Sequence, residues 1–349
     1  MAKRMPFLDS IRFIACTWVF INHFIDDLFP LYFAFWKMKP FSYVLSGYHV
    51  KVGVAAFAVI LGYLAAKSGT NKNRSFLRYT VDRYSYFFVA GLLANTIILA
   101  FVLFTPEYMH ILNVRADGTS IGSALLEIFR NSVLLDAEIY ETFWFIKPFF
   151  YASIICFVLG RFEVGLIPVV VLDFIFYTTG QGWIAICLLG VLLFRITEDG
   201  IYKSALSNRS VKIGMLVLSI ALIKLLPEES ALTYLVDGIS NLLFLLVMFN
   251  SDLLQKLFRW SGIKTITGKY MAFLILHRQV LHVLASLLNR RYEGILNTHA
   301  GFFGVMLLCY VVTILLCFPM DWLLNTLHKF ICKVLTYIPF EKIEGKIQA

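Results

Sequence analysis

The sequence predicts an all-α protein, a polytopic transmembrane bundle of about ten helices. Hydrophobic residues make up 59% of the 349 and charged residues only 15%, whereas charged residues are about a quarter of an ordinary globular domain. Long apolar runs also recur along the whole chain, as expected where successive helices of about 20 residues cross a bilayer. The 33 phenylalanines suit side chains that face lipid and the membrane interfaces.

We expect a single transmembrane domain over residues 1–349. The first apolar run is too long for a cleavable signal peptide, so we expect it to be retained as a spanning helix. The fifth and sixth spans are short, and two glycines near their boundary predict a tight turn between them. The ten predicted spans are roughly residues 9–29, 50–67, 84–105, 144–160, 164–178, 182–196, 211–226, 233–250, 268–289 and 301–325.

The positions of the basic residues support a count of ten, because cytoplasmic loops of membrane proteins are enriched in Lys and Arg. With both termini in the cytoplasm, five basic clusters all fall on the cytoplasmic side, and the more acidic segment 106–143 falls outside. The net charge of +9 therefore has a membrane explanation, and we expect no nucleic-acid partner. The clusters are Lys3 and Arg4; Lys67, Lys72, Arg74, Arg78 and Arg83; Arg195, Lys203, Arg209 and Lys212; Lys256, Arg259 and Lys264; and Lys329, Lys333, Lys342 and Lys346.

Arg12 and His23 stand out within the first apolar run. Eleven residues of α-helix return to nearly the same face about 16 Å further along the axis, so the two side chains share one stripe. Ionisable residues inside a membrane are costly and commonly functional. A neutral His23 suits the role of a general base, and the alternative is a histidine that only packs between helices. Asp9 lies three positions before Arg12, where an ion pair is favourable, so Arg12 also has a purely local interpretation.

Three arginines lie at the cytoplasmic mouth of the third span, in the sequence RSFLRYTVDR. The positive-inside bias explains Arg74 and is the simpler explanation for Arg78. Arg83 is the better candidate for a phosphate contact, because a guanidinium binds phosphate through two parallel hydrogen bonds. No Walker-type or GxGxxG loop is present, so side chains would have to hold a nucleotide.

His277 and Trp144 are further candidate residues within the predicted spans. His277 in the ninth span forms either a second polar wall of a cavity or a bond between helices. Trp144 suits an aromatic anchor at the outer interface. The six cysteines show no CxxC or CxxH spacing, so neither a disulfide framework nor a metal site is indicated.

The first two spans resemble a known family. FLDSIRFIACTWVFINH is similar to the opening helix of the membrane-bound acyltransferase 3 family, LDGLRGIAALLVVLFH, with Asp9, Arg12 and His23 at the family's spacing. GVAAFAVILGYL resembles that family's second-helix pattern GVDLFFVLSGFL. Ala55 and Leu61 stand where the family has Asp and Ser.

Three later segments extend the resemblance over essentially the whole chain. FLRYTVDRYSYF is similar to the family's FLKKRLLRIYP, in which Arg83 matches the second arginine and Thr80 replaces the first. GKYMAFLILH, ending at His277, resembles GKxSLxIYLLH, with Met271 in place of Ser. TFWFI, which contains Trp144, resembles the WFL segment of the polysaccharide-modifying branch.

The resemblance implies a ten-helix O-acyltransferase of the bacterial inner membrane. It would move an acyl group, usually acetyl, from acetyl-CoA to a hydroxyl of a surface carbohydrate, without a metal. His23 would be the general base, while Arg12, Arg83 and Arg78 would bind the CoA phosphates. Asp9, Trp144 and His277 would support the substrates. A homodimer is compatible with the sequence. The alternatives are a transporter or flippase that uses the stripe as a polar path and a scaffold whose polar residues only pack.

Overall fold

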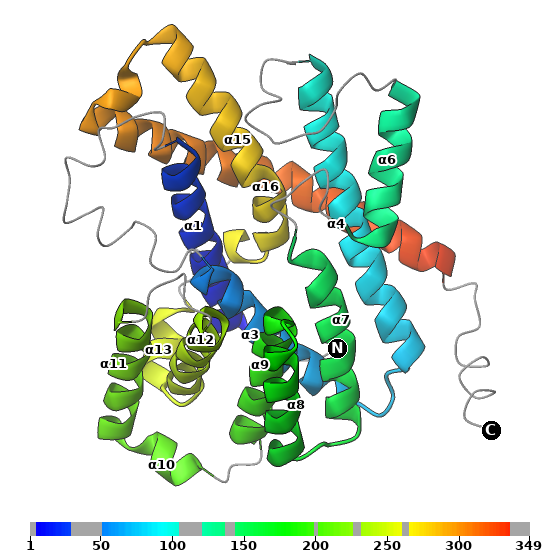
Figure 1. Ribbon diagram of the computed structural model, residues 1–349, viewed down its shortest axis with the longest axis vertical. Helices are drawn as coiled ribbons and strands as arrows, with labels where there is room; N and C mark the ends of the chain where they lie inside the picture. Colours follow the sequence, from blue (N-terminus) through cyan, green and yellow to red (C-terminus); the bar gives the residue numbers. More distant parts are fainter. Residues whose placement is uncertain are drawn as a thin grey trace. The chain divides into compact units, whose positions relative to one another are not determined.

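The computed structural model describes residues 5–28, 51–104, 121–136, 144–198, 202–225, 232–259 and 265–335, and this part of the chain is all α-helical (Figure 1). The predicted class is therefore confirmed. The 14 helices are α1 (Pro6–Leu28), α3 (Val52–Gly69), α4 (Phe76–Phe104), α6 (Ile121–Leu134), α7 (Ile146–Arg161), α8 (Leu166–Thr178), α9 (Gly182–Glu198), α10 (Lys203–Ser207), α11 (Arg209–Leu225), α12 (Thr233–Phe249), α13 (Asp252–Leu257), α15 (Tyr270–Arg291), the 3₁₀ helix η5 (Ile295–Asn297) and α16 (His299–Leu335).

A helix covers the described part of each of the ten predicted spans. Four described helices are long and apolar enough to cross a bilayer, namely α1, α3, α15 and α16. Their number indicates a multi-pass membrane protein. α8 and α12 are apolar but shorter, with 13 and 17 residues. The short α8 agrees with the short fifth span that the sequence predicts.

Three elements differ from the sequence prediction. α4 begins eight residues before the predicted span at residue 84, so Arg78 and Arg83 lie on helix instead of in a loop. α16 continues ten residues past residue 325, with Pro319 inside it. α6 was not predicted, because its 14 residues form an amphipathic helix and not a continuous apolar run, inside the segment interpreted as an outer loop.

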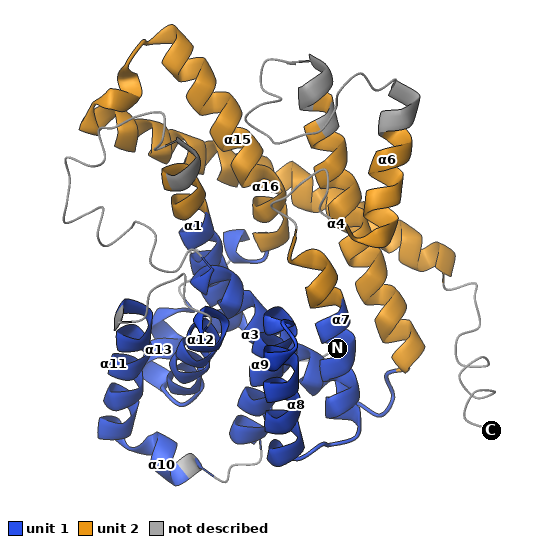
Figure 2. Ribbon diagram, viewed as in Figure 1, with its two compact units in different colours: residues 1–19, 47–74, 151–268 blue, residues 20–46, 75–150, 269–349 orange. Residues whose placement is uncertain are grey.

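The chain folds into two compact units, and each of them is built from separate stretches of sequence (Figure 2). Unit 1 comprises residues 1–19, 47–74 and 151–268, and unit 2 comprises residues 20–46, 75–150 and 269–349. Helix α1 contributes its residues up to Val19 to unit 1 and its remaining residues to unit 2. Arg12 therefore packs in unit 1, and His23 packs in unit 2.

Unit 1 is organised by close contact between α3 and α9, which lie side by side (Figure 1). A side chain on Gly62 of α3 would collide with the Cys187 carbonyl of α9, and one on Gly190 of α9 would collide with the Val59 carbonyl of α3. Small residues allow such close approach between membrane helices, where packing replaces the hydrophobic effect as the driving force. Gly62, part of the motif that resembles the acyltransferase family, thus has a packing role.

Unit 2 is organised around α4, α15 and α16, which contact one another, with α6 packed on α4. Polar contacts between side chains also join these helices. Asn95 Nδ2 of α4 donates to Ser132 Oγ of α6 at 3.3 Å, and Lys269, just before α15, forms a 2.9 Å ion pair with Asp321 of α16. Hydrogen bonds of this kind between helices add to the packing inside a membrane.

Candidate functional site

Three of the predicted site residues, Asp9, Arg12 and His23, lie on the single helix α1. Arg12 Nη1 lies 3.4 Å from Asp9 Oδ1, and each of the two side chains is 13% exposed. The predicted local ion pair is therefore confirmed. His23 follows eleven residues later on the same helix, about 16 Å along its axis.

His23 lies against His277 of α15 within unit 2. The two imidazole centroids are 5.3 Å apart and the rings are inclined by 42°. His277 is fully buried, whereas His23 is partly buried. The sequence named both residues, and the structure brings them together from positions 254 residues apart.

The hydrogen bonds of His277 fix its tautomer. Nδ1 lies 3.2 Å from the carbonyl oxygen of Phe273 and 3.0 Å from that of Leu274. Since both of these atoms only accept hydrogen bonds, Nδ1 must carry the hydrogen and Nε2 must present a lone pair. Nε2 is buried and has no hydrogen-bond partner among the residues that the structure describes. The Nδ1 bonds stay within α15, so they join no helices.

An aromatic cluster surrounds this pair of imidazoles. Phe273 stacks on His277 with the ring planes 9° apart, and it also meets Phe20 and Tyr310 edge-on. Phe24, one residue after His23, packs edge-on against Phe302 at 5.0 Å. The imidazole pair therefore lies in a largely aromatic part of unit 2.

Asn22, which precedes His23, is a second polar residue of unit 2 with unused hydrogen-bonding capacity. Its side chain is 3% exposed, and its Nδ2 has no partner within the described part of the chain. A buried donor left unsatisfied costs roughly 1–3 kcal/mol. Such atoms in native proteins commonly mark a position where a ligand or water binds.

The predicted arginines of α4 occupy different environments. Arg78 is exposed. The Arg83 guanidinium lies over the Tyr79 ring, 5.4 Å from its centroid, and its buried Nε has no hydrogen-bond partner among the described residues. Trp144 lies just before α7, half-buried and edge-on to Phe145 at 5.9 Å.

Unit 1 contains a cavity of about 640 Å³ where the start of α1 meets the last turns of α3 and α9. Its volume falls in the range of sites for small molecules and cofactors, roughly 300–1,000 Å³. Its walls combine apolar and aromatic residues with two cations and one carboxylate. The lining residues are Met5, Pro6, Phe7, Tyr63, Lys67, Thr197, Glu198, Phe249, Asn250, Gln255 and Arg259.

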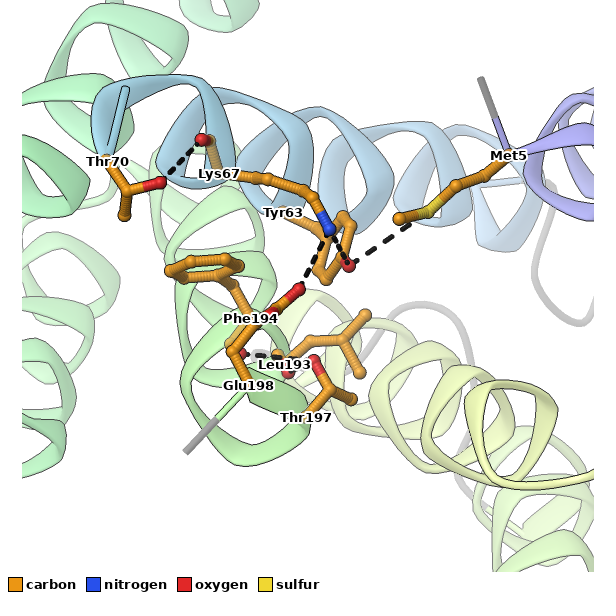
Figure 3. A network of polar contacts seen from close by, with 8 residues as sticks. All are labelled: Met5, Tyr63, Lys67, Thr70, Leu193, Phe194, Thr197 and Glu198. Carbon is orange, nitrogen blue, oxygen red and sulfur yellow. Dashed lines mark hydrogen bonds and ion pairs between the residues drawn. The ribbon is translucent and has the colours of Figure 1, made fainter. Parts of the chain in front are cut away.

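A polar network runs along one wall of this cavity (Figure 3). Lys67 Nζ donates to Glu198 Oε1 at 2.8 Å and to the Tyr63 hydroxyl at 3.5 Å. That hydroxyl in turn faces the Met5 sulfur at 4.0 Å, while Thr197 donates back to the carbonyl of Leu193. Lys67 was predicted in a loop, but it belongs to the last turn of α3. The network fixes its ammonium group at the cavity wall.

Arg195 was also expected in a cytoplasmic loop, but it is buried near the end of α9 and 8% exposed. Its Nε and Nη2 have no hydrogen-bond partner among the described residues. Arg195 lies three positions before Glu198, so the two side chains lie on the same side of the helix. A buried guanidinium with unused donors is a natural partner for an anion.

Sequence reasoning thus missed most of the unit 1 site. Tyr63 and Lys67 are four residues apart in an apolar run, a spacing that places them on one helix face. This signal was available, but the lysine was interpreted as part of the positive-inside bias. No sequence pattern joins Lys67 to Glu198, because 131 residues separate them.

The chain matches no protein-family model, no curated protein and no solved structure. The resemblance to the acyltransferase 3 family therefore stays a prediction, and a function has to be argued from the side chains themselves.

Proposed function

We propose that this protein is an O-acyltransferase of the bacterial inner membrane. It transfers an acyl group, acetyl in the first instance, from acyl-CoA to a hydroxyl of a cell-surface or exported carbohydrate. The observation that carries the proposal is the imidazole pair in unit 2. His277 holds an unused buried acceptor atom there, and its ring lies 5.3 Å from that of His23.

A carbohydrate hydroxyl complements the unused polar atoms of unit 2. It can donate to an acceptor such as His277 Nε2, and its oxygen can accept from a donor such as Asn22 Nδ2. An apolar ligand would leave both of these buried atoms unsatisfied. The polar atoms of unit 2 therefore suit an alcohol as the acceptor.

The reaction needs one proton acceptor and no metal. His23 takes the proton of the acceptor hydroxyl while the oxygen attacks the thioester carbonyl carbon. The carbon–sulfur bond then breaks, the ester forms, and the CoA thiolate leaves and recovers the proton. General-base catalysis of this kind contributes about 10²- to 10⁴-fold in rate. His277 Nε2 accepts a hydrogen bond from a neighbouring hydroxyl of the same sugar and so holds the reacting hydroxyl beside His23.

We place the donor at the cytoplasmic end of unit 1. The cavity beside Lys67 and Arg259 has room for part of a CoA molecule, and Arg195 offers unused donors to a phosphate. Arg12 lies on the helix that leads from unit 1 to His23, and the phosphopantetheine arm is longer than the 16 Å or so between these residues. Arg83 and Arg78 remain candidates for further phosphate contacts.

The proposal includes ten spans with both termini in the cytoplasm, as the basic clusters predict. It also places the acceptor site towards the outer side, with segment 106–143 helping to shape it. Only residues 121–136 of this segment lie within the described structure. Reporter fusions after Pro339 test the topology, and an external C-terminus contradicts it.

The decisive experiment incubates membranes containing the protein with radiolabelled acetyl-CoA and an extract of surface glycans. We expect label in the glycan fraction, and none from membranes of a deletion strain. Mass spectrometry of surface glycans from both strains then identifies the modified sugar. Binding of acetyl-CoA without any transfer or hydrolysis contradicts the proposal and favours the transporter alternative.

A further inference from the structure

Three potential metal ligands meet between α4 and α16, and none of them belongs to the imidazole pair or lines the cavity. They are Asp82 of α4 and His328 and Cys332 of α16, all within unit 2. His328 Nε2 lies 3.3 Å from Cys332 Sγ and 3.5 Å from Asp82 Oδ1. The third distance, from Cys332 Sγ to Asp82 Oδ1, is 3.9 Å. The proposed acyl transfer uses none of these residues.

The arrangement differs from a catalytic triad of cysteine, histidine and aspartate. In a triad the carboxylate binds one imidazole nitrogen and the nucleophile binds the other. Here the carboxylate and the sulfur both approach the same nitrogen, Nε2 of His328. Three ligand atoms that converge on one another in this way enclose a single point, as the ligands of a metal ion do.

The distances agree with one face of a zinc tetrahedron. Zinc lies about 2.3 Å from sulfur and about 2.0–2.2 Å from nitrogen and oxygen, so tetrahedral ligands are about 3.3–3.8 Å apart. The observed separations run from 3.3 to 3.9 Å. Sulfur, imidazole and carboxylate together form a ligand set that zinc accepts.

We propose that Asp82, His328 and Cys332 bind a divalent zinc-like cation, with water as the fourth ligand. The Cys332 thiol releases its proton to solvent when its sulfur bonds to the metal. The His328 ring stays neutral and presents the Nε2 lone pair, giving up the 3.2 Å contact that Nε2 makes with the Asp82 carbonyl oxygen. Two helices of unit 2 are thereby joined through the metal.

The surroundings of the cluster suit such a site. His328 and Cys332 are four residues apart on α16, which places both on one helix face. Ser85 Oγ lies 3.4 Å from Cys332 Sγ, where it can donate to a thiolate. The side chains of His328 and Asp82 are 18% and 41% exposed, so a metal ion can enter from the surface.

The test uses the full-length protein in detergent with Co²⁺ as a spectroscopic probe and Zn²⁺ as a competitor. We expect a thiolate-to-cobalt charge-transfer band in the wild-type protein, and its loss on addition of Zn²⁺. Cys332→Ser and His328→Ala should remove the band, and Asp82→Asn should weaken Zn²⁺ binding at least about tenfold. The matched controls Cys309→Ser, His299→Ala and Asp321→Asn lie outside the cluster and should keep it.

A second measurement needs no variant. Cys332 is the partly exposed member of the six cysteines, and the other five are buried, so a maleimide should label Cys332 first. Zn²⁺ should protect it from labelling, as read by mass spectrometry. No charge-transfer band, a band that survives Cys332→Ser, or labelling that Zn²⁺ leaves unchanged overturns the proposal.

Discussion

The two units hold their polar side chains in contrasting ways. In unit 1 the cavity is lined by long charged side chains that reach solvent, and Lys67 is neutralised by Glu198 at 2.8 Å. In unit 2 the polar groups near the end of α1 are uncharged amide and imidazole groups among phenylalanine rings, as in the pair of His23 and His277.

Under the proposed function, this contrast would assign donor recognition to unit 1 and proton transfer to unit 2. Charged groups beside water can bind and release an anionic donor, because solvent lowers the cost of leaving them unpaired. An imidazole with an unused acceptor atom, as His277 has, can accept a hydrogen bond from a hydroxyl and so suits the acceptor side of the proposed reaction. We therefore expect changes in unit 1 to alter donor affinity and changes in unit 2 to alter turnover.

The largest effect is expected from Gly190→Leu, which disrupts the packing of α9 against α3 in unit 1. The new side chain would collide with the backbone of α3 at Val59, and overpacking costs about 1–3 kcal/mol even where only side chains must move. Monodisperse protein after detergent extraction, and its Tm, should fall sharply. Gly214→Leu on α11 is the matched control, because nothing lies within 4 Å of its added carbon. Equal behaviour of the two variants contradicts the packing role.

His23→Ala should leave a folded protein and lower kcat at least about 100-fold, because a general base contributes that much. The KM for acetyl-CoA should hardly change, since we propose that the donor binds in unit 1. Acetyl transfer in detergent or vesicles measures both constants. The exposed His299 supplies the control His299→Ala. A variant that keeps more than about a tenth of the turnover excludes His23 as the base.

Lys67→Met should raise the KM for acetyl-CoA about tenfold with kcat little changed. A hydrogen bond to a charged group contributes about 1.5–3 kcal/mol, and each 1.4 kcal/mol is a factor of ten. Lys256→Met removes an exposed lysine of α13 that does not line the cavity, so its KM should match the wild type. A reduced kcat at an unchanged KM would instead assign Lys67 to proton transfer. The two units would then not differ in their effects on donor affinity and turnover.

The smallest effect is expected from Arg12→Lys, which keeps the charge but loses the planar fork. Arg12 already pairs with Asp9, so we expect the KM for acetyl-CoA to rise only about threefold, the scale of a weak ion pair. Arg83→Lys should behave alike. Lower protein yield with an unchanged KM would assign both arginines a structural role.

Much of the fold follows from hydropathy alone. A segment that is apolar over the thickness of a bilayer has to satisfy its backbone internally, so it forms a helix, and helices cover the predicted spans. The first residues of α4 and the last residues of α16 were not predicted to be helical. Hydropathy detects the segment that lies in lipid, whereas the helix itself continues past that segment into polar sequence. α6 was missed for the same reason, since its outward face combines apolar and charged residues.

The candidate site was only partly predictable. The shared stripe of Arg12 and His23 could be predicted from the sequence because both residues lie on one helix, whose geometry is known without a structure. His277 was named, but its contact with His23 depends on how α1 and α15 pack. Lys67 and Arg195 were assigned to loops because a basic residue at the end of an apolar run looks the same whether it is buried or solvated.

Helix α16 has 37 residues, which extend about 55 Å when straight, whereas a bilayer with its headgroups is about 40–45 Å thick. Lying wholly within the bilayer would require a tilt of about 40°. In a thicker membrane the helix can stand more upright, and in a thinner one it must tilt further or extend past the headgroups. The thickness of the host membrane would thus act on the tilt of α16 together with its packing against α4 and α15.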